Sequence, residues 1–242
     1  MVWVALIVCV LVGYLVGSVC SAVIVSKIFA LPDPRLEGSQ NPGATNVLRL
    51  AGKKYAVIVL LADLLKGLLP VLLAKLIGAN EFIQACTCFA AVFGHMYPVF
   101  FDFKGGKGVA TTLGGLLALN FILGVMVIAT WLIIANFTRY SSFASIVSVI
   151  FMPFYSIYIF KGLYVFSPLF FITVFVLFKH RNNITRLIDG TESKIVFRRH
   201  GSLKNPEPIE IAEEVTHLDE PAIVTPKKTR AKRAPRRVKK ST

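Results

Sequence analysis

The chain has 242 residues, of which 55% are hydrophobic and 17% are charged. A soluble globular domain carries about a quarter charged residues, so this composition excludes an ordinary soluble domain and indicates an integral membrane protein. The formal net charge of +14 is uneven, because residues 193–242 hold 13 Lys or Arg against 6 Asp or Glu. Half of the positive excess therefore belongs to the C-terminal end.

Seven apolar segments approach the length of about 20 residues that a membrane-spanning helix needs. They cover residues 3–26, 55–78, 82–101, 108–119, 120–138, 143–160 and 163–179. The fourth is too short to span alone, which predicts a half-length or tilted helix packed against protein. The sequence thus predicts an all-α integral membrane protein with seven transmembrane helices, one of them short.

Lys and Arg gather in the loops after the first, third and fifth segments and in the chain after the seventh. Basic residues mark the cytoplasmic side of a membrane protein. We therefore predict that the N-terminus lies outside and the C-terminus in the cytoplasm.

The composition changes near residue 201. Residues 207–220 are acidic and contain no Lys or Arg, whereas residues 227–240 hold nine basic residues and no acid. Such composition is typical of disorder. We predict a membrane-embedded domain over residues 1–200 and a disordered cytoplasmic tail over residues 201–242, whose partner stays open between anionic lipid, RNA and solvent.

Residues 38–49, with the sequence GSQNPGATNVLR, form the first polar motif. A turn at Pro42 and Gly43 would expose successive backbone N–H groups, which can form an anion-binding nest. The motif also offers hydroxyl and amide groups, from Ser39, Asn41, Thr45 and Asn46. Arg49 adds a guanidinium that matches phosphate. The alternative is a polar loop with helix caps and an arginine that only marks topology.

A second motif lies in residues 94–112, GHMYPVFFDFKGGKGVATT. Gly105, Gly106 and Gly108 allow the backbone to approach a ligand closely. Lys104 and Lys107 add charge, and the start of the following helix favours anions. The alternative is a glycine-rich reverse turn with membrane-anchoring lysines.

The third motif, HRNNITRLIDGTE, covers residues 180–192. His180, Asn183 and Arg186 are spaced i, i+3 and i+6, so a helix would bring them together. A charge-capped helix end explains the arginines equally well.

Two charged residues, Asp63 and Lys66, lie inside the second predicted span at a spacing of i, i+3. Charges inside a membrane helix need a partner or a cavity. We favour a structural ion pair that braces the helix over direct catalysis.

Familiar catalytic signatures are missing from the sequence. His95 is followed by an acid only at Asp102, so the HxxxxD arrangement of the common glycerolipid acyltransferases is absent, as are GxSxG and HExxH. Four cysteines, Cys9, Cys20, Cys86 and Cys88, lie in apolar runs without metal-ligand spacing. We expect no metal and no cofactor, and chemistry that relies on positioning and electrostatics.

The motifs GSQNPGATNVLR, DLLKG, GHMYPVFFDFKGGKGVATTLG and HRNNITRL with a trailing GTE occur in this order. They resemble the acyl-phosphate-dependent glycerol-3-phosphate acyltransferases of bacteria, the PlsY family. The resemblance implies transfer of an acyl group from acyl phosphate to the sn-1 hydroxyl of glycerol 3-phosphate in phospholipid biosynthesis. It places the enzyme in the bacterial inner membrane, with its site on the cytoplasmic side, in contact with membrane lipid and without a need for nucleic acid.

The resemblance also implies roles for the motif residues. The catalytic set would be Ser39, Arg49, Lys107, His180 and Asn183. The substrate-binding set would be Asn41, Gly43, Ala44, Thr45, Asn46, Lys104, Gly105, Gly106 and Glu192, with Glu192 pairing a cation. The rings of Phe100, Phe101 and Phe103 either border the acyl groove or belong to a lipid-facing aromatic belt.

A transporter for an organic phosphate is the rival class, because charges and glycine-broken helices also mark substrate pathways. A pathway would place polar groups along both halves of the membrane. In this chain almost all of them are predicted on one side.

Overall fold

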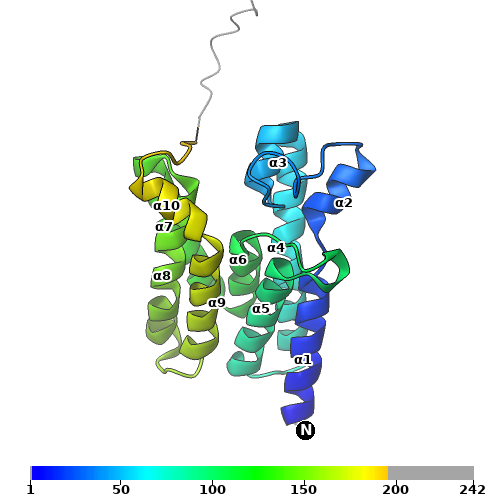
Figure 1. Cartoon of the computed structure of the whole chain (residues 1–242). Helices are drawn as coiled ribbons and strands as arrows, with labels where there is room; N and C mark the ends of the chain where they lie inside the picture. The colour runs from blue at the N-terminus through cyan, green and yellow to red at the C-terminus, as the bar shows by residue number, and fades with distance from the viewer. Residues whose placement is uncertain (1, 196–242) are drawn as a thin grey trace, which may run out of the picture. The chain divides into compact units, whose positions relative to one another are not determined.

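The computed structural model describes residues 2–195, which form helices and loops without a strand (Figure 1). The helices are α1 (Val2–Gly17), α2 (Ser21–Ile28), α3 (Ala44–Ala51), α4 (Lys53–Leu76), α5 (Glu81–Met96), the 3-10 turn η1 (Val99–Phe101), α6 (Val109–Leu119), α7 (Phe121–Thr138), α8 (Ser141–Phe160), α9 (Phe166–Lys179) and α10 (Arg181–Ile188). The predicted tail over residues 201–242 lies outside the described residues.

Five segments among these residues are long and apolar enough to cross a membrane. They are Val2–Ile28, Lys53–Leu76, Glu81–Phe101, Phe121–Thr138 and Ser141–Phe160, and the shorter apolar helices α6 and α9 accompany them. The predicted all-helical membrane class is confirmed, and α6 is short as expected. The count of seven crossings and their orientation stay predictions.

The first predicted span, residues 3–26, is interrupted in the structure. Helix α1 ends at Gly17 and α2 begins at Ser21. A Cβ atom on Gly17 would lie 2.1 Å from the Ala91 carbonyl oxygen of α5, so the two backbones touch there. In the break, the Val19 carbonyl accepts a hydrogen bond of 2.7 Å from Lys66 Nζ. A continuous helix would use that carbonyl internally, so a contact from α4 holds the interruption open.

Glycines allow α4 and α6 to pack closely side by side. A Cβ atom on Gly67 would lie 2.0 Å from the Thr111 carbonyl oxygen, and one on Gly114 would lie 1.9 Å from the Leu64 carbonyl oxygen. Small residues at such crossings are typical of membrane helices. This packing fixes the start of α6, and with it the glycine-rich turn that precedes α6, against the middle of α4.

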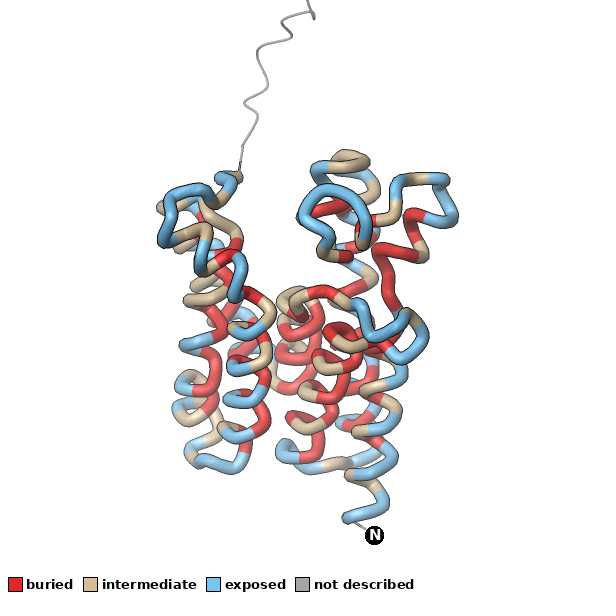
Figure 2. Tube along the Cα trace, viewed as in Figure 1, coloured by how far each residue is buried: buried red, intermediate tan, exposed pale blue. Residues whose placement is uncertain are grey.

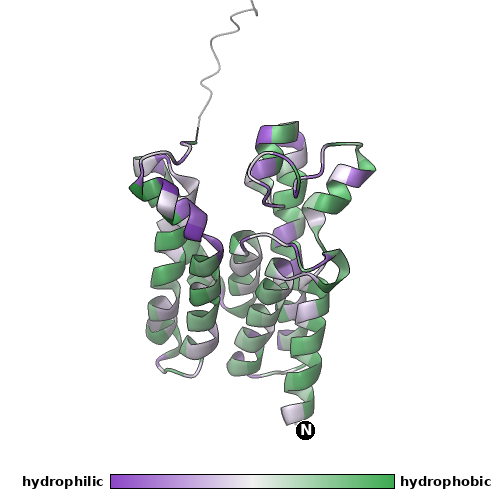
Figure 3. Cartoon of the chain, viewed as in Figure 1, coloured by the Kyte–Doolittle hydropathy of each residue, from purple (hydrophilic) through white to green (hydrophobic). Residues whose placement is uncertain are grey.

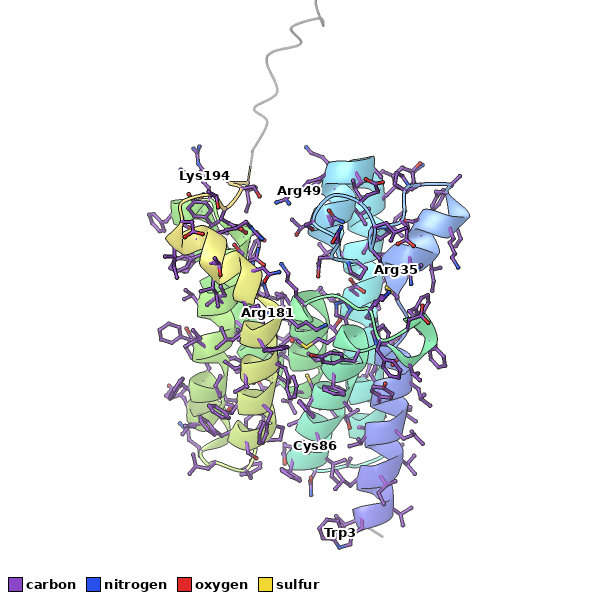
Figure 4. The ribbon with its side chains drawn as sticks, viewed as in Figure 1. Trp3, Arg35, Arg49, Cys86, Arg181 and Lys194 are labelled. Atoms are coloured by element: carbon purple, nitrogen blue, oxygen red, sulfur yellow. The ribbon has the colours of Figure 1, made fainter. Side chains whose placement is uncertain are left out.

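Burial and hydropathy divide the bundle into a core, an apolar outer surface and a polar end. Buried residues gather where α4, α5 and α6 face one another, while the outer faces are exposed (Figure 2). Those outer faces are apolar, and hydrophilic residues concentrate at the end that carries α2, α3 and α10 (Figure 3). Arg49 and Lys194 lie at this end and Trp3 lies at the other (Figure 4).

The predicted ion pair inside the second span is confirmed. Lys66 Nζ lies 2.8 Å from Asp63 Oδ1 on α4, and both side chains are buried.

Candidate functional site

The loop before α3 is held by one buried amide. The Asn46 side chain, 1% exposed, donates to the carbonyl oxygens of Pro34 and Glu37 at 3.0 Å and accepts from the Ser39 N–H at 2.9 Å. Gly38 has φ +64°, and a Cβ atom on it would lie 2.4 Å from Asn46 Oδ1. Both amide protons of Asn46 are therefore committed to the loop itself, and the residue acts on the site by positioning Ser39.

Helix α3 begins directly after Gly43, whose carbonyl accepts the N–H groups of Asn46 and Val47. Among the described residues, the N–H groups of Ala44 and Thr45 have no protein acceptor. Free N–H groups in the first turn of a helix are donors for an anion. The structure thus leaves two donors at the place where the sequence predicts phosphate contacts.

The glycine-rich turn before α6 packs directly on His95 and on the first loop. The Gly106 N–H donates to the His95 carbonyl oxygen at 3.1 Å. A Cβ atom on Gly105 would lie 2.0 Å from that oxygen, and one on Gly106 would lie 2.3 Å from His95 Nε2 and 3.1 Å from the Pro42 carbonyl oxygen. Only glycine fits at these two positions. Because Pro42 belongs to the first motif, the two predicted anion-binding loops are neighbours.

Lys107 joins the glycine-rich turn to the third motif. Its ammonium donates to Asn183 Oδ1, and Asn183 Nδ2 donates to Glu192 Oε1 at 2.7 Å. Burial lowers the pKa of Lys107 to about 8. The neighbouring cations Arg186 and Arg49 also lower it, and Glu192 partly opposes this shift. The ammonium is therefore still mostly charged at neutral pH, and it sits in a place where its charge is poorly solvated.

Glu192 is the common acceptor of this network. Besides Asn183, Ser142 Oγ donates to Oε1 at 2.7 Å, and Arg186 Nε donates to Oε2 at 2.7 Å. Burial raises the pKa of Glu192, but these three hydrogen bonds outweigh it and hold the pKa below the usual range. The predicted pairing of Glu192 with a cation is present, and Arg186 is the partner.

His180 lies between α9 and α10 and caps both helices. Its ring is 3% exposed, and Nδ1 lies 2.8 Å from the Val176 carbonyl oxygen. Burial and the nearby charge of Lys107 lower the pKa of His180 to about 4, so the ring is neutral at physiological pH. A carbonyl only accepts hydrogen bonds, so Nδ1 carries the proton and Nε2 offers a lone pair.

Arg49 connects α3 to the segment that follows α10. Its guanidinium donates to Ser193 Oγ at 2.5 Å. Ser193 was not singled out by the sequence, because a lone serine carries no signal until its neighbour across the molecule is known. Through this contact, the first motif meets the residue that directly follows the third motif.

The structure brings Arg49, Lys107, Asn183, Glu192 and Gly106 into connected contacts. Four other predicted site residues make no side-chain hydrogen bond or ion pair with another part of residues 2–195, namely Ser39, Asn41, Thr45 and Lys104. All four belong to the first two motifs, three of them in loops and Thr45 in the first turn of α3, and they do not join the network.

Comparison with known proteins adds an independent result. The family model described as glycerol-3-phosphate acyltransferase matches residues 7–190. A glycerol-3-phosphate acyltransferase of Legionella pneumophila (strain Corby) is 62% identical over 189 residues, which cover 78% of this chain and 68% of that protein. One from Francisella tularensis subsp. novicida is 51% identical over 183 residues, or 76% of this chain and 89% of that protein.

Two crystal structures of PlsY, an integral membrane glycerol 3-phosphate acyltransferase, have similar folds. The glycerol 3-phosphate form has a TM-score of 0.74 and 39% identity, and it covers 79% of this chain and 96% of its own. The lysophosphatidic acid form has a TM-score of 0.72 and 38% identity, with coverage of 79% and 95%. These similarities confirm the family that the motifs indicated.

Proposed function

Since the chain belongs to the glycerol-3-phosphate acyltransferase family, we propose that it transfers a fatty acyl group from acyl phosphate to the sn-1 hydroxyl of glycerol 3-phosphate. The products are lysophosphatidate and inorganic phosphate, and the reaction belongs to phospholipid biosynthesis. The observation that carries the proposal is the meeting of three polar motifs around Lys107, through Pro42 beside Gly106 and Asn183 beside Lys107.

An acyl phosphate suits this site because both reactants bring a phosphate. Lys107 and Arg49 supply positive charge, while the turn at Gly105 and Gly106 and the start of α3 at Ala44 supply backbone donors. Such fixed donors stabilise the charge that develops on the oxyanion and on the leaving phosphate. Holding both reactants in attack geometry contributes about 7–11 kcal/mol more.

In the proposed reaction the oxygen of the sn-1 hydroxyl of glycerol 3-phosphate attacks the carbonyl carbon of the acyl phosphate. The new ester bond forms as the bond between that carbon and the phosphate oxygen breaks, and the phosphate leaves with the bonding electrons. The hydroxyl proton passes to the departing phosphate, which is itself a base. His180, neutral with an open Nε2, orients glycerol 3-phosphate by accepting a hydrogen bond from the hydroxyl that does not react.

The remaining site residues have matching roles in the proposal. Ser39 contacts the phosphate groups together with Arg49 and Lys107, and Asn183 orients glycerol 3-phosphate together with His180. The phosphate cradle is completed by Asn41, Gly43, Ala44, Thr45, Lys104, Gly105 and Gly106. Asn46 and Glu192 position these groups, the first through Ser39 and the second through Asn183.

The proposal includes the topology. Seven crossings, with α6 and α9 as the short ones, place the N-terminus outside the bacterial inner membrane and the polar end at the cytoplasm. This orientation is supported by the cations at that end, since Lys and Arg favour the cytoplasmic side. It also places the site where glycerol 3-phosphate and membrane lipid are both accessible.

The decisive experiment measures phosphate release by the purified protein in vesicles. We expect release from palmitoyl phosphate only after glycerol 3-phosphate is added, with lysophosphatidate formed in equal amount. Uptake of glycerol 3-phosphate into sealed vesicles without phosphate release would overturn the proposal and favour a transporter. Activity with an acyl thioester in place of palmitoyl phosphate would overturn the choice of donor.

A further inference from the structure

The buried ion pair of α4 continues to a third residue, His95, in the last turn of α5. Asp63 Oδ1 lies 2.8 Å from Lys66 Nζ and 3.5 Å from His95 Nδ1. The three residues are each at most 6% exposed. Lys66 also donates to the Val19 carbonyl oxygen in the break between α1 and α2. One buried cluster therefore links three parts of the bundle.

Such a cluster is costly at membrane depth. Charged groups there lose their hydration, and well-packed apolar side chains brace helices at least as well. Helix bracing alone therefore gives no reason for this particular set of groups. What the set adds is direction. Asp63 Oδ1 and His95 Nδ1 are 3.5 Å apart, and neither atom has a hydrogen-bond partner among the described residues, so the carboxylate acts on that edge of the ring through its charge.

The opposite edge of the His95 ring faces the glycine-rich turn. Nε2 of His95 would lie 2.3 Å from a Cβ atom on Gly106, and the backbone carbonyl oxygen of His95 accepts the Gly106 N–H at 3.1 Å. His95 thus contacts the turn through both its ring and its backbone. The turn is followed directly by Lys107, whose ammonium joins the site network.

We propose that Asp63, Lys66 and His95 form a positioning unit that sets the backbone of Gly105 and Gly106 for phosphate. The negative charge of Asp63 favours the orientation in which Nδ1 of His95 faces it. Lys66 pairs with Asp63 and also donates to the Val19 carbonyl oxygen. His95 then supports the glycine-rich turn through its ring and its backbone carbonyl oxygen, just before α6 begins. The inference rests on the proposed function, since it assigns this turn to a phosphate-bearing substrate.

The experiment replaces Asp63 by asparagine, which keeps its size and removes its charge. With palmitoyl phosphate and glycerol 3-phosphate, we expect kcat/KM of the folded full-length D63N protein to fall on the order of 10- to 100-fold, as small misplacements of binding groups do. Inhibition by inorganic phosphate should weaken in parallel. A bracing role would lower the melting temperature but leave the phosphate inhibition constant of the folded protein unchanged.

A double-mutant cycle tests whether Asp63 acts on the glycine-rich turn through His95. His95→Phe keeps a ring behind Gly106 but loses the contact with Asp63. If Asp63 acts through His95, D63N combined with H95F weakens phosphate inhibition no more than either change alone. Independent, additive effects would overturn the proposed route. If D63N fails to fold, Asp63→Glu replaces it, and an unchanged phosphate inhibition constant in that variant overturns the inference.

Matched controls use polar contacts on the same two helices, α4 and α5, at positions farther from His95. Lys75 on α4 donates to the Ala118 carbonyl oxygen at 3.2 Å, and Thr87 on α5 donates to the Ile83 carbonyl oxygen at 2.8 Å. Lys75→Met and Thr87→Val should lower the melting temperature without changing phosphate inhibition. If the wild-type protein does not turn over palmitoyl phosphate, the proposed function fails by itself. Calorimetry with inorganic phosphate on wild-type and D63N protein then tests the inference directly.

Discussion

Lys107 and Asn183 are 76 residues apart in the sequence, yet the Lys107 ammonium donates a hydrogen bond to the Asn183 carboxamide oxygen. Asn183 donates onward to Glu192, so a chain of contacts runs from the glycine-rich turn to the segment after α10. Asn183 thus fixes the position of the ammonium. In the proposed reaction a charge fixed in this way would meet a phosphate with little reorganisation, which is the condition under which fixed charges contribute most to catalysis.

The charge of Lys107 should limit activity at alkaline pH. Its pKa is lowered to about 8, and the cationic form is the one that neutralises phosphate, so kcat/KM should fall as pH rises through about 8. Lys107→Met should lose about 10²- to 10³-fold in kcat, as for one lost oxyanion donor. Lys107→Arg should retain activity with its alkaline fall moved to higher pH. The check is a pH profile of all three proteins, and an unmoved alkaline limb in Lys107→Arg would contradict the assignment.

His180 should act as a neutral group throughout the physiological range. Because burial lowers its pKa to about 4, the ring gains a proton only when pH falls toward that value. His180→Ala should lower kcat/KM on the order of 10²-fold, the loss expected when a group that positions a reactant is removed. The pH profile of wild-type activity should have no inflection near pH 6.5 that is due to His180. The check is whether the wild-type profile has an inflection there that the His180→Ala profile lacks. Such an inflection would mean that His180 titrates as an ordinary exposed histidine.

Glu192 should stabilise the fold at neutral pH and less so in acid. Its pKa lies below the ordinary value of 4.5, so its contribution is complete above that pH and is lost as pH falls through the folded-state pKa. At pH 7, Glu192→Gln should be less stable by about 1.5–3 kcal/mol, the range for hydrogen bonds to a charged group. Thermal unfolding at a series of pH values measures this. A difference between the two proteins that stays constant below pH 4.5 would contradict it.

Gly106 should tolerate no side chain. In Gly106→Ala the new methyl group would lie 2.3 Å from His95 Nε2, so the turn must shift away from its position. We expect a higher KM for the phosphate-bearing substrates and a loss in kcat/KM on the order of 10²-fold, typical of a displacement near 1 Å. Gly162→Ala, in the loop between α8 and α9, serves as the control with unchanged kinetics. Wild-type kinetics in Gly106→Ala would show that the turn is remote from the substrates.

Removal of residues 201–242 should leave catalysis intact. The family model ends at residue 190, and the contacts that join the three motifs all lie within residues 2–195. The measurement compares kcat and KM of the shortened and full-length proteins in the same vesicles. An inactive shortened protein that is still folded would assign part of the site to the tail.

The helical class was predictable because apolar length by itself identifies membrane helices. The break at residues 18–20 was not predicted, because Ser18, Val19 and Cys20 lie within one long apolar run that is compatible with a continuous span. It depends on the close approach of Gly17 to Ala91 and on the hydrogen bond from Lys66 to Val19. Such contacts come from tertiary packing, and no local pattern encodes them.

The candidate site was predictable as a set of segments but not as a set of contacts. Charge and glycine content marked the segments that hold Arg49, Lys107 and His180. The same chemistry could not show that Asn46 is buried within its loop while Ser39 is exposed, since both are small and polar. Nor could it pair Arg49 with Ser193, because that contact joins residues 144 positions apart.

The short length of α6 determines how far the chemistry lies below the membrane surface. Its 11 residues rise about 16 Å, roughly half of the hydrocarbon thickness of about 30 Å. Helix α4, with 24 residues, rises about 36 Å beside it. Lys107, two residues before the short helix, would therefore lie below the membrane surface in the proposed topology. In the proposed reaction, glycerol phosphate would reach Lys107 from the water, and the carbonyl of the fatty chain would reach it from the leaflet, so neither reactant would have to leave its own solvent.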